Sequence, residues 1–321
     1  MRIEGVDIEA VFGGIPADAV DNVACLAELV GAEKAESIVK ATGFATRRAA
    51  PAGTDVFDLA LPAAKRAIEG TDPSQIAGVI AVSFSNRDRF PALSARLQHA
   101  LGLASATAAY DISMACSGWI YGLFAASQLV KATGKKVLLV DGDVQSAWTD
   151  RSDPNTLAVM GDGASAALLA PGAGVWDFAF YTDGSGADAL RCRETISMDG
   201  FGVFRFVAGP VRKFLSSFLQ SSELLAGTDP VFVPHQANMY MVRQLSESLG
   251  LKDRTCGSGA KYANTGSCSA ALTMADGLGC IPADGGRIPV LLAGFGAGLS
   301  AAAAATAVGA YRCGMVLVSA R

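Results

Sequence analysis

The sequence predicts an α/β protein with two similar halves, each rich in β-α units, packed about a pseudo-dyad. Composition is the first reason. The 321 residues are 51% hydrophobic and 17% charged and include 36 glycines, which is typical of buried parallel strands covered by helices. The second reason is a repeated order of elements, because each half reads as a buried strand, a helix that opens at a polar loop, and further strands. We place the halves at residues 1–172 and 173–321.

The first half opens with a short strand and a helix over about residues 21–41. A second helix is predicted over about 55–69, and the apolar run 77–82 that follows it predicts a central strand. A loop of alternating charge then leads to a helix that ends near Leu101. Two more buried strands are expected, at 135–140 and 164–169.

A thiol lies in the segment 111–122, where a strand ends and an apolar helix begins. The first turn of a helix carries unpaired N–H groups and the positive end of the helix dipole, which biases a cysteine there toward the thiolate. Cys116 is therefore a candidate nucleophile. The alternative is a small buried hydrophobic residue, the commonest role of a free cysteine.

The second half repeats this order. A strand at 230–233 leads into a polar loop, residues 262–267 open an alanine-rich helix, and strands follow at 288–293 and from Leu299 onward. No charge occurs from Ile288 to Tyr311, a length that would suit a membrane span. Glycine, alanine and proline dominate this stretch, however, and favour two buried strands around a glycine loop.

Charge and cysteine usage exclude several classes of protein. A net charge of -4 and a pI near 5.3 argue against nucleic acid or an anionic membrane as the main partner. The seven cysteines form no CxxC pair, which argues against a disulfide framework or a zinc cluster, and we expect neither a metal nor a cofactor. Without a signal-peptide pattern at the N-terminus, we expect a cytoplasmic protein.

The chain has two histidines. His99 lies in a helical pattern and is expected on a helix surface, whereas His235 directly follows a buried strand, where loops often carry function. A neutral imidazole there can donate a hydrogen bond or accept a proton near neutral pH. Asn264, in a second polar loop, can donate its amide N–H to a developing oxyanion, although an asparagine in a loop is commonly a turn residue.

Together these segments resemble the thiolase superfamily, and within it the β-ketoacyl-ACP synthase III (KAS III) group. The resemblance rests on ordered motifs that span nearly the whole chain: 42–43 with Arg47 and Arg48, 111–122, 161–164, 198–200 with 203–206, 233–238, 263–265 and 294–298. It implies a thiolase-like fold of five αβαβα layers and a homodimer. It also implies Cys116, His235 and Asn264 as the catalytic triad.

The implied reaction is a decarboxylative Claisen condensation in fatty acid or specialised acyl-chain biosynthesis. Cys116 would take an acyl group from an acyl-CoA or acyl-ACP primer, with the backbone amides of Cys116 and Ala297 as its oxyanion hole. His235 and Asn264 would then stabilise the enolate formed from malonyl-ACP. The absence of a second cysteine in 294–298 argues against degradative thiolases. The alternatives are an acyltransferase of the same fold that acts on an alcohol or amine, and a non-condensing partner subunit.

The resemblance also implies the residues that line the acyl pocket: Phe90 of the partner subunit, Gln145, Met160, Ile196 and Met198. Gln145 stands where relatives have an apolar residue, and Arg87 and Arg89 flank Phe90. We therefore expect a primer with a polar or carboxylate end, recognised by Arg87 or Gln145. The alternative for Arg87 is an interface salt bridge with Asp88.

The chain departs from the family at the expected CoA clamp. Ser37 stands where acetyl-CoA-using members have a tryptophan, and Pro154 stands at the place of its arginine partner. Residues from about 309 to 321 extend past the usual end of the family. The candidates for docking the acyl carrier protein, which could equally form a solvated basic face, are Arg205, Arg212, Lys213 and Arg243.

Overall fold

The computed structural model describes residues 1–278 and 286–319, so that Cys280 lies outside the described residues. Within them, nine strands form one mixed sheet. Seven strands follow the order β10-β11-β12-β7-β6-β4-β5; β1 pairs with β7 outside this order, and β13 pairs with β1. Its strands are β1 (Arg2–Pro16), β4 (Ile76–Val82), β5 (Ala108–Ile112), β6 (Lys136–Asp143), β7 (Gly163–Thr182), β10 (Val231–Pro234), β11 (Ile288–Gly296), β12 (Ser300–Val308) and β13 (Arg312–Val318). Two small strand pairs stand apart: β2 (Ala19–Asp21) with β3 (Thr46–Arg48), and β8 (Leu190–Cys192) with β9 (Ile196–Met198).

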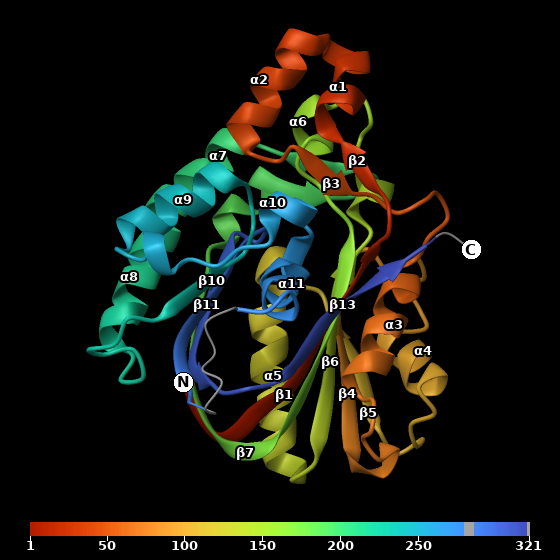
Figure 1. The fold of residues 1–321 in the computed structure, drawn as a ribbon, viewed down its shortest axis with the longest axis vertical. Helices are drawn as coiled ribbons and strands as arrows, with labels where there is room; N and C mark the ends of the chain where they lie inside the picture. The colour runs from red at the N-terminus through yellow and green to blue at the C-terminus, as the bar shows by residue number, and fades with distance from the viewer. Residues whose placement is uncertain (279–285, 320–321) are drawn as a thin grey trace.

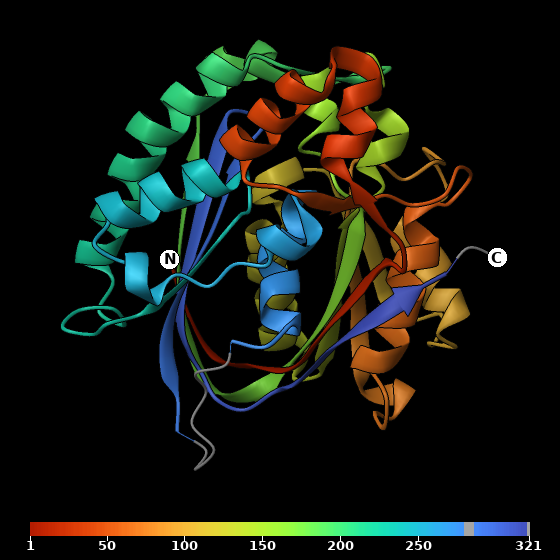
Figure 2. The same ribbon diagram turned by 45° about the horizontal axis from the view of Figure 1, so that its top comes forward.

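Strand β7 joins the two halves of the sheet. Its first part, 163–169, pairs with β6, and its last part, 176–182, pairs with β12. The sheet folds around the helices α5 (Gly118–Thr133) and α11 (Ser269–Ala275), which lie between its two wings (Figure 2). The molecule therefore has a helix layer at its centre and a sheet layer on either side.

Two outer helix layers complete five αβαβα layers (Figure 1). Helices α3 (Val56–Ala67) and α4 (Leu93–Ala100) share one apolar cluster with the first wing, and the helical segments 200–221 and 239–248 share another with the second. The remaining helices are α1 (Asn22–Val30), α2 (Ala32–Thr42), α6 (Pro154–Leu157), α7 (Gly200–Phe206), α8 (Arg212–Ser221), α9 (Met239–Ser248) and α10 (Gly259–Tyr262). The predicted thiolase-like α/β architecture is confirmed.

The strand pairing of the two halves is alike. In each, a parallel pair is followed by an antiparallel one: β4 with β6 and β6 with β7, then β10 with β11 and β11 with β12. This repeat supports the prediction of two fused halves. Their boundary at 172/173 falls within the continuous strand β7 and stays a prediction.

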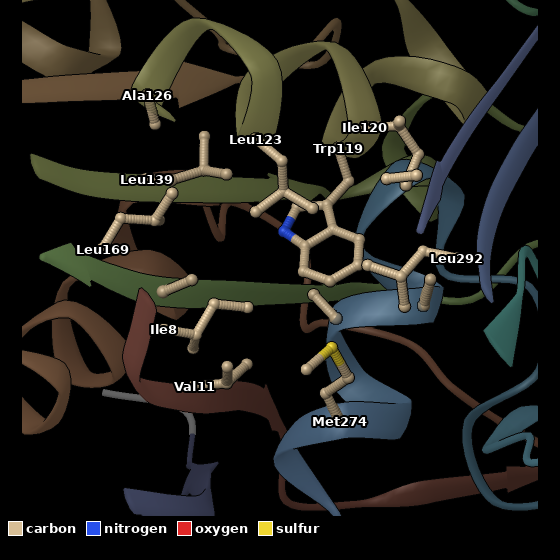
Figure 3. Packing of buried hydrophobic residues seen from close by; sticks show 14 of the residues in the cluster. Ile8, Val11, Trp119, Ile120, Leu123, Ala126, Leu139, Leu169, Met274 and Leu292 are labelled. Carbon is tan, nitrogen blue, oxygen red and sulfur yellow. The ribbon is translucent and has the colours of Figure 1, made fainter. Parts of the chain in front are cut away.

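The central helix α5 packs closely because glycines face the sheet. A Cβ atom at Gly118 would lie 2.5 Å from Val82 Cγ1, and one at Gly122 would lie 2.7 Å from Leu139 Cδ1, so a larger residue would push the helix away. Trp119, 1% exposed, fills the space between the halves beside Leu292 and Met274 (Figure 3). Replacing such a side chain with alanine typically costs about 3–5 kcal/mol.

Several predicted elements differ in extent. The predicted helix over 21–41 is two helices, because Gly31 has a φ of 81° and interrupts the helical backbone. The first strand is 15 residues long rather than short. The strand predicted at 164–169 extends to Thr182, past the Pro171–Gly172 turn signal, and the β1–β7 pairing shifts register beside that signal.

The uncharged stretch from Ile288 forms β11 and β12, which pair antiparallel around residues 297–299, as the sequence predicted. Within the described residues, no helix is long and apolar enough to cross a membrane.

The C-terminal extension has a structural place that the sequence did not predict. Strand β13 pairs in parallel with residues 10–16 of β1. The Met315 side chain lies over Gly13, where a Cβ atom would come within 2.5 Å of it. Arg312 donates a hydrogen bond to the carbonyl of Ala67 at the end of α3.

Candidate active site

A cavity of about 640 Å³ lies where the two halves meet, and it is lined by residues from both. Cys116 comes from the turn before α5, His235 follows β10, and Asn264 follows α10. The three side chains that the sequence singled out thus come from distant parts of the chain to one cavity. Residues 295–297, between β11 and β12, form another part of its wall.

Cys116 occupies a tight turn, Ala115–Ser117, between β5 and α5. Ala115 has a φ of 44°, a left-handed conformation that costs a residue with a side chain about 1 kcal/mol or more. The backbone of β11 packs against this turn. A Cβ atom at Gly294 would lie 2.8 Å from Ser117 Cα, and one at Gly296 would lie 2.8 Å from Cys116 Sγ. These glycines keep the space beside the sulfur open.

Burial raises the pKa of the Cys116 thiol to about 11, and the nearby Asp143 and Asp141 act in the same direction. Hydrogen bonds from the backbone of Ala297 and of Cys116 itself lower this pKa, but by less. The prediction that the helix start favours the thiolate is therefore wrong for the free protein, because the sequence does not show how far the sulfur is withdrawn from water. The same two backbone groups, predicted as the oxyanion hole, face the sulfur.

A pair of serines connects the nucleophile turn to the loop of Ala297. The Oγ atoms of Ser117 and Ser300 lie 2.7 Å apart, and Ser300 Oγ also donates to the carbonyl of Ala297 at 2.8 Å. Both serines are buried. Sequence reasoning missed Ser300, because a serine at the start of an alanine-rich strand carries no distinct signal.

His235 is held on three sides. Its backbone N–H donates to the carbonyl of Ala293 at 2.7 Å, its Nδ1 atom lies 2.9 Å from Ser269 Oγ, and its ring packs edge-on against Phe295. Ser269 Oγ also accepts the N–H of Gln236. When the serine donates its own proton to Nδ1, the imidazole carries its proton on Nε2, which faces the cavity in the proposed reaction. Burial lowers the pKa of His235 to about 4, against a smaller opposing effect of a backbone hydrogen bond at Gly266. The ring is neutral at physiological pH.

The Asn264 side chain is oriented by its own loop. Its Oδ1 atom accepts the N–H of Gly266 at 3.0 Å, and its Nδ2 atom donates to the carbonyl of Ala237 at 3.3 Å. Its backbone carbonyl accepts from the N–H of Gly161 at 2.8 Å and from Gln145 Nε2 at 2.6 Å. The side-chain amide of Asn264 therefore faces the cavity next to the loop of His235. Its NH₂ group makes one weak hydrogen bond, so it can still donate to a substrate.

Five of the predicted pocket residues lie in the cavity wall. Arg87, Gln145, Met160, Ile196 and Met198 line the cavity. The Gln145 amide donates to the carbonyls of Gly161 and Asn264, so its N–H groups are already used.

Comparison with known proteins agrees with this geometry. Residues 110–184 match the family model 3-Oxoacyl-[acyl-carrier-protein (ACP)] synthase III, and residues 221–308 match the model of its C-terminal part. The chain is 32% identical over 270 residues to a beta-ketoacyl-[acyl-carrier-protein] synthase III of Geobacillus kaustophilus, which covers 81% of this chain and 85% of that protein. The chain belongs to the 3-oxoacyl-[acyl-carrier-protein] synthase III family.

Other relatives match a larger share of this chain. A beta-ketoacyl-[acyl-carrier-protein] synthase III of Gloeobacter violaceus is 33% identical and covers 92% of this chain and 96% of its own. The crystal structure of a 3-oxoacyl-(acyl-carrier protein) synthase from Burkholderia xenovorans superposes with a TM-score of 0.91 at 28% identity, over 100% of this chain and 98% of that one. The priming beta-ketosynthase of the R1128 polyketide pathway superposes with a TM-score of 0.85 at 29% identity, over 95% and 97%.

Two sets of family-derived residues lie outside the cavity. Phe90, expected to act across a dimer, is 86% exposed and is absent from the cavity wall of its own chain. The four basic residues proposed for carrier docking are exposed on α7, α8 and α9: Arg205, Arg212, Lys213 and Arg243. Two of them lie over exposed aromatic rings, Arg205 over Phe201 and Arg243 over Tyr240.

Proposed function

We propose that the protein catalyses a decarboxylative Claisen condensation, as a 3-oxoacyl-ACP synthase III. The observation that supports this most is the meeting of Cys116, His235 and Asn264 in one cavity, with two backbone N–H groups at the sulfur. A nucleophile alone would serve any acyl transfer. The added pair of neutral N–H donors is what an enolate intermediate requires.

In the first step the Cys116 thiolate attacks the carbonyl carbon of an acyl thioester. The backbone N–H groups of Cys116 and Ala297 stabilise the oxyanion of the tetrahedral intermediate. The carrier thiolate then leaves and takes up a proton. Because the free thiol has a raised pKa, the attack uses the small thiolate fraction that these N–H groups help to stabilise.

In the second step a malonyl thioester occupies the other side of the cavity, with its thioester oxygen toward Asn264 Nδ2 and His235 Nε2. The bond between its carboxylate and the α-carbon breaks, CO₂ leaves, and the electron pair forms the enolate. The enolate carbon attacks the acyl carbonyl on Cys116, and the cysteine leaves as a thiolate. A neutral His235, as its lowered pKa dictates, donates an N–H without having to lose a positive charge.

The partners follow from this reaction. Malonyl-ACP is the extender, an acyl-CoA or acyl-ACP is the primer, and the exposed basic residues of α7–α9 would dock the acidic carrier protein. A homodimer is supported by Phe90, whose large exposed ring would be covered by a second subunit. Ser37, in place of a tryptophan, favours a primer that does not depend on stacking of adenine.

The test combines two readouts. Intact mass spectrometry after incubation with acyl-CoA or acyl-ACP should show one acyl group, located on Cys116, and the loaded protein should release labelled CO₂ from carboxyl-labelled malonyl-ACP. An Asn264→Ala variant should still load but release CO₂ at least about 100-fold more slowly. Loading with transfer to an alcohol or amine and no CO₂ would instead show the acyltransferase, and no loading would show a non-condensing partner subunit.

A further inference from the structure

The positive charge in the cavity wall comes from two segments. Arg87 and Arg89 lie in the loop after β4, and Arg191 and Arg193 lie on β8 and the turn that follows it. Within the described chain, no aspartate, glutamate or lysine lines this cavity. The segments from α2 and α9 that line it contribute only neutral residues, among them Ile38, Thr42 and Met241.

Three of these four arginines form no ion pair with a residue that the structure describes. Asp88 Oδ2 lies 3.9 Å from Arg96. Glu194 lines a neighbouring cavity that Arg87 also borders, but it forms no ion pair with Arg87 among the described residues. Asp188 forms an ion pair with Arg191, but its side chain is 91% exposed. The Arg87 side chain donates one hydrogen bond, to the carbonyl of Gly53. The guanidinium groups of Arg89 and Arg193 have no hydrogen bond or ion pair with a residue that the structure describes. At least three guanidinium groups thus remain available at the cavity.

Strand β8 connects this charge to the nucleophile. Leu190 Cδ2 lies 3.9 Å from the point where a Cβ atom of Gly296 would stand, and that point is 2.8 Å from Cys116 Sγ. Cys192 follows two residues later on the same face of the strand and also lines the cavity. Arg191 and Arg193 alternate with these two residues along the chain and also line the cavity. An acyl chain that follows β8 away from the sulfur therefore starts in an apolar contact at Leu190 and runs beside these arginines.

We propose that the acyl group carried by Cys116 ends in a carboxylate, which the arginines of the 87–89 loop and of the 191–193 segment recognise. Guanidinium groups bind a carboxylate through paired N–H donors, and a wall with arginines but no acid would stabilise an anion and gain nothing from a methyl end. The Gln145 amide, whose N–H groups are already donated to backbone carbonyls, has no part in this recognition. The inference rests on the proposed function, since it requires that Cys116 be acylated.

A phosphate on the primer carrier would satisfy the same arginines, so the test uses thioesters without phosphate. N-acetylcysteamine thioesters of matched length are compared in pairs: succinyl with butyryl, glutaryl with pentanoyl, and adipyl with hexanoyl. The rate of acylation of Cys116 is followed by intact mass spectrometry. In at least one pair the wild type should load the carboxylate-ended group at least tenfold faster.

The double variant Arg87→Gln/Arg193→Gln should lower that ratio at least tenfold, and a urea unfolding transition like that of the wild type shows that the variant is folded. Arg66→Gln, on the outer helix α3 and away from the cavity, is the matched control and should keep the ratio. Equal loading of both members of all pairs would overturn the proposal, as would an unchanged ratio in the double variant. A double variant that slows both members of each CoA thioester pair equally, and leaves the N-acetylcysteamine thioesters unaffected, would assign the arginines to the carrier phosphates instead. Failure of every thioester to load Cys116 would contradict the proposed function as well.

Discussion

Ser117 and Ser300 place their hydroxyl oxygens 2.7 Å apart, although they are 183 residues apart in the chain. Ser117 directly follows the nucleophile, and Ser300 donates a hydrogen bond to the carbonyl of Ala297. The backbone N–H of Ala297 faces the sulfur of Cys116. One buried hydrogen-bond chain thus connects the two groups of the proposed oxyanion hole, one from each half of the molecule.

Replacing Ser300 with alanine should slow acylation of Cys116 by roughly tenfold, because the Ala297 loop loses its support and its N–H donor, whose complete removal would cost about 100-fold or more, is only partly misplaced. Unfolding free energy should fall by roughly 1–2 kcal/mol, since a buried hydroxyl loses its partner. Acylation is measured by intact mass and stability by urea unfolding. Ser300→Thr, which keeps the hydroxyl, should recover most of the rate; equal defects in both variants would contradict a positioning role.

Gly296→Ala should abolish acylation, because the new Cβ would lie 2.7 Å from Cys116 Cβ and 2.8 Å from its sulfur. The matched control is Gly184→Ala, where nothing lies within 4 Å of the added methyl group. Intact mass after incubation with an acyl thioester measures both. Normal loading of Gly296→Ala would show that the glycine does not hold this space open.

The pKa of about 11 for Cys116 predicts slow alkylation at neutral pH. The rate constant for iodoacetamide at this residue should rise about tenfold per pH unit from pH 7 to 10, because only the thiolate reacts. Peptide mass spectrometry separates Cys116 from the other cysteines. A rate that levels off below pH 8 would mean that the thiolate is stabilised more than burial allows.

The lowered pKa of His235 predicts a ring that stays neutral in the native protein. Its Cε1 proton signal in NMR should not move between pH 5.5 and 8, and His99→Gln identifies the signal, since the chain has two histidines. The contribution of His235 to the free energy of unfolding is therefore full above about pH 6.5. It is lost as the pH falls toward 4, where the native ring also becomes charged. Titration of this signal near pH 6.5 would contradict a desolvated imidazole.

For Asp143 we expect the free energy of unfolding to change with pH in the opposite direction. Burial raises its pKa from 3.8 to about 7, so its contribution to stability is full below about pH 4 and is lost as the pH rises toward 7. An asparagine can still accept the N–H groups of Phe84 and Ser85. Asp143→Asn should therefore gain stability relative to the wild type as the pH rises from 5 to 7, by up to about 1.4 kcal/mol per unit. Urea unfolding at each pH measures this, and a difference independent of pH would contradict it.

The sequence predicted that Cys116, His235 and Asn264 come together, because the motifs that carry them are local. Cys116, His235 and Asn264 each follow a recognisable strand or loop, and their order along the chain matched one family. Ser269 and Ser300 were missed, since their role depends on contacts across the fold. The predicted thiolate was wrong for the same reason, because burial of the sulfur comes from both halves together.

The extent of the strands was also beyond sequence reasoning. Strand β7 continues past a proline–glycine turn signal because its second part pairs with β12, which lies more than a hundred residues later. Strand β13 lies outside the residues matched by the family models, and its place beside β1 depends on a glycine at position 13 that admits Met315. Both features come from long-range pairing, which local pattern does not specify.

The central claim is that carbon–carbon bond formation occurs on an acyl group held by Cys116. A single-turnover experiment tests it directly: protein preloaded with one acyl group is mixed with carboxyl-labelled malonyl-ACP, and labelled CO₂, residual acyl-protein and 3-oxoacyl-ACP are quantified at each time. The account predicts that one CO₂ and one 3-oxoacyl-ACP appear for each acyl group lost. Loss of the acyl group without CO₂, or CO₂ without 3-oxoacyl-ACP, would contradict it.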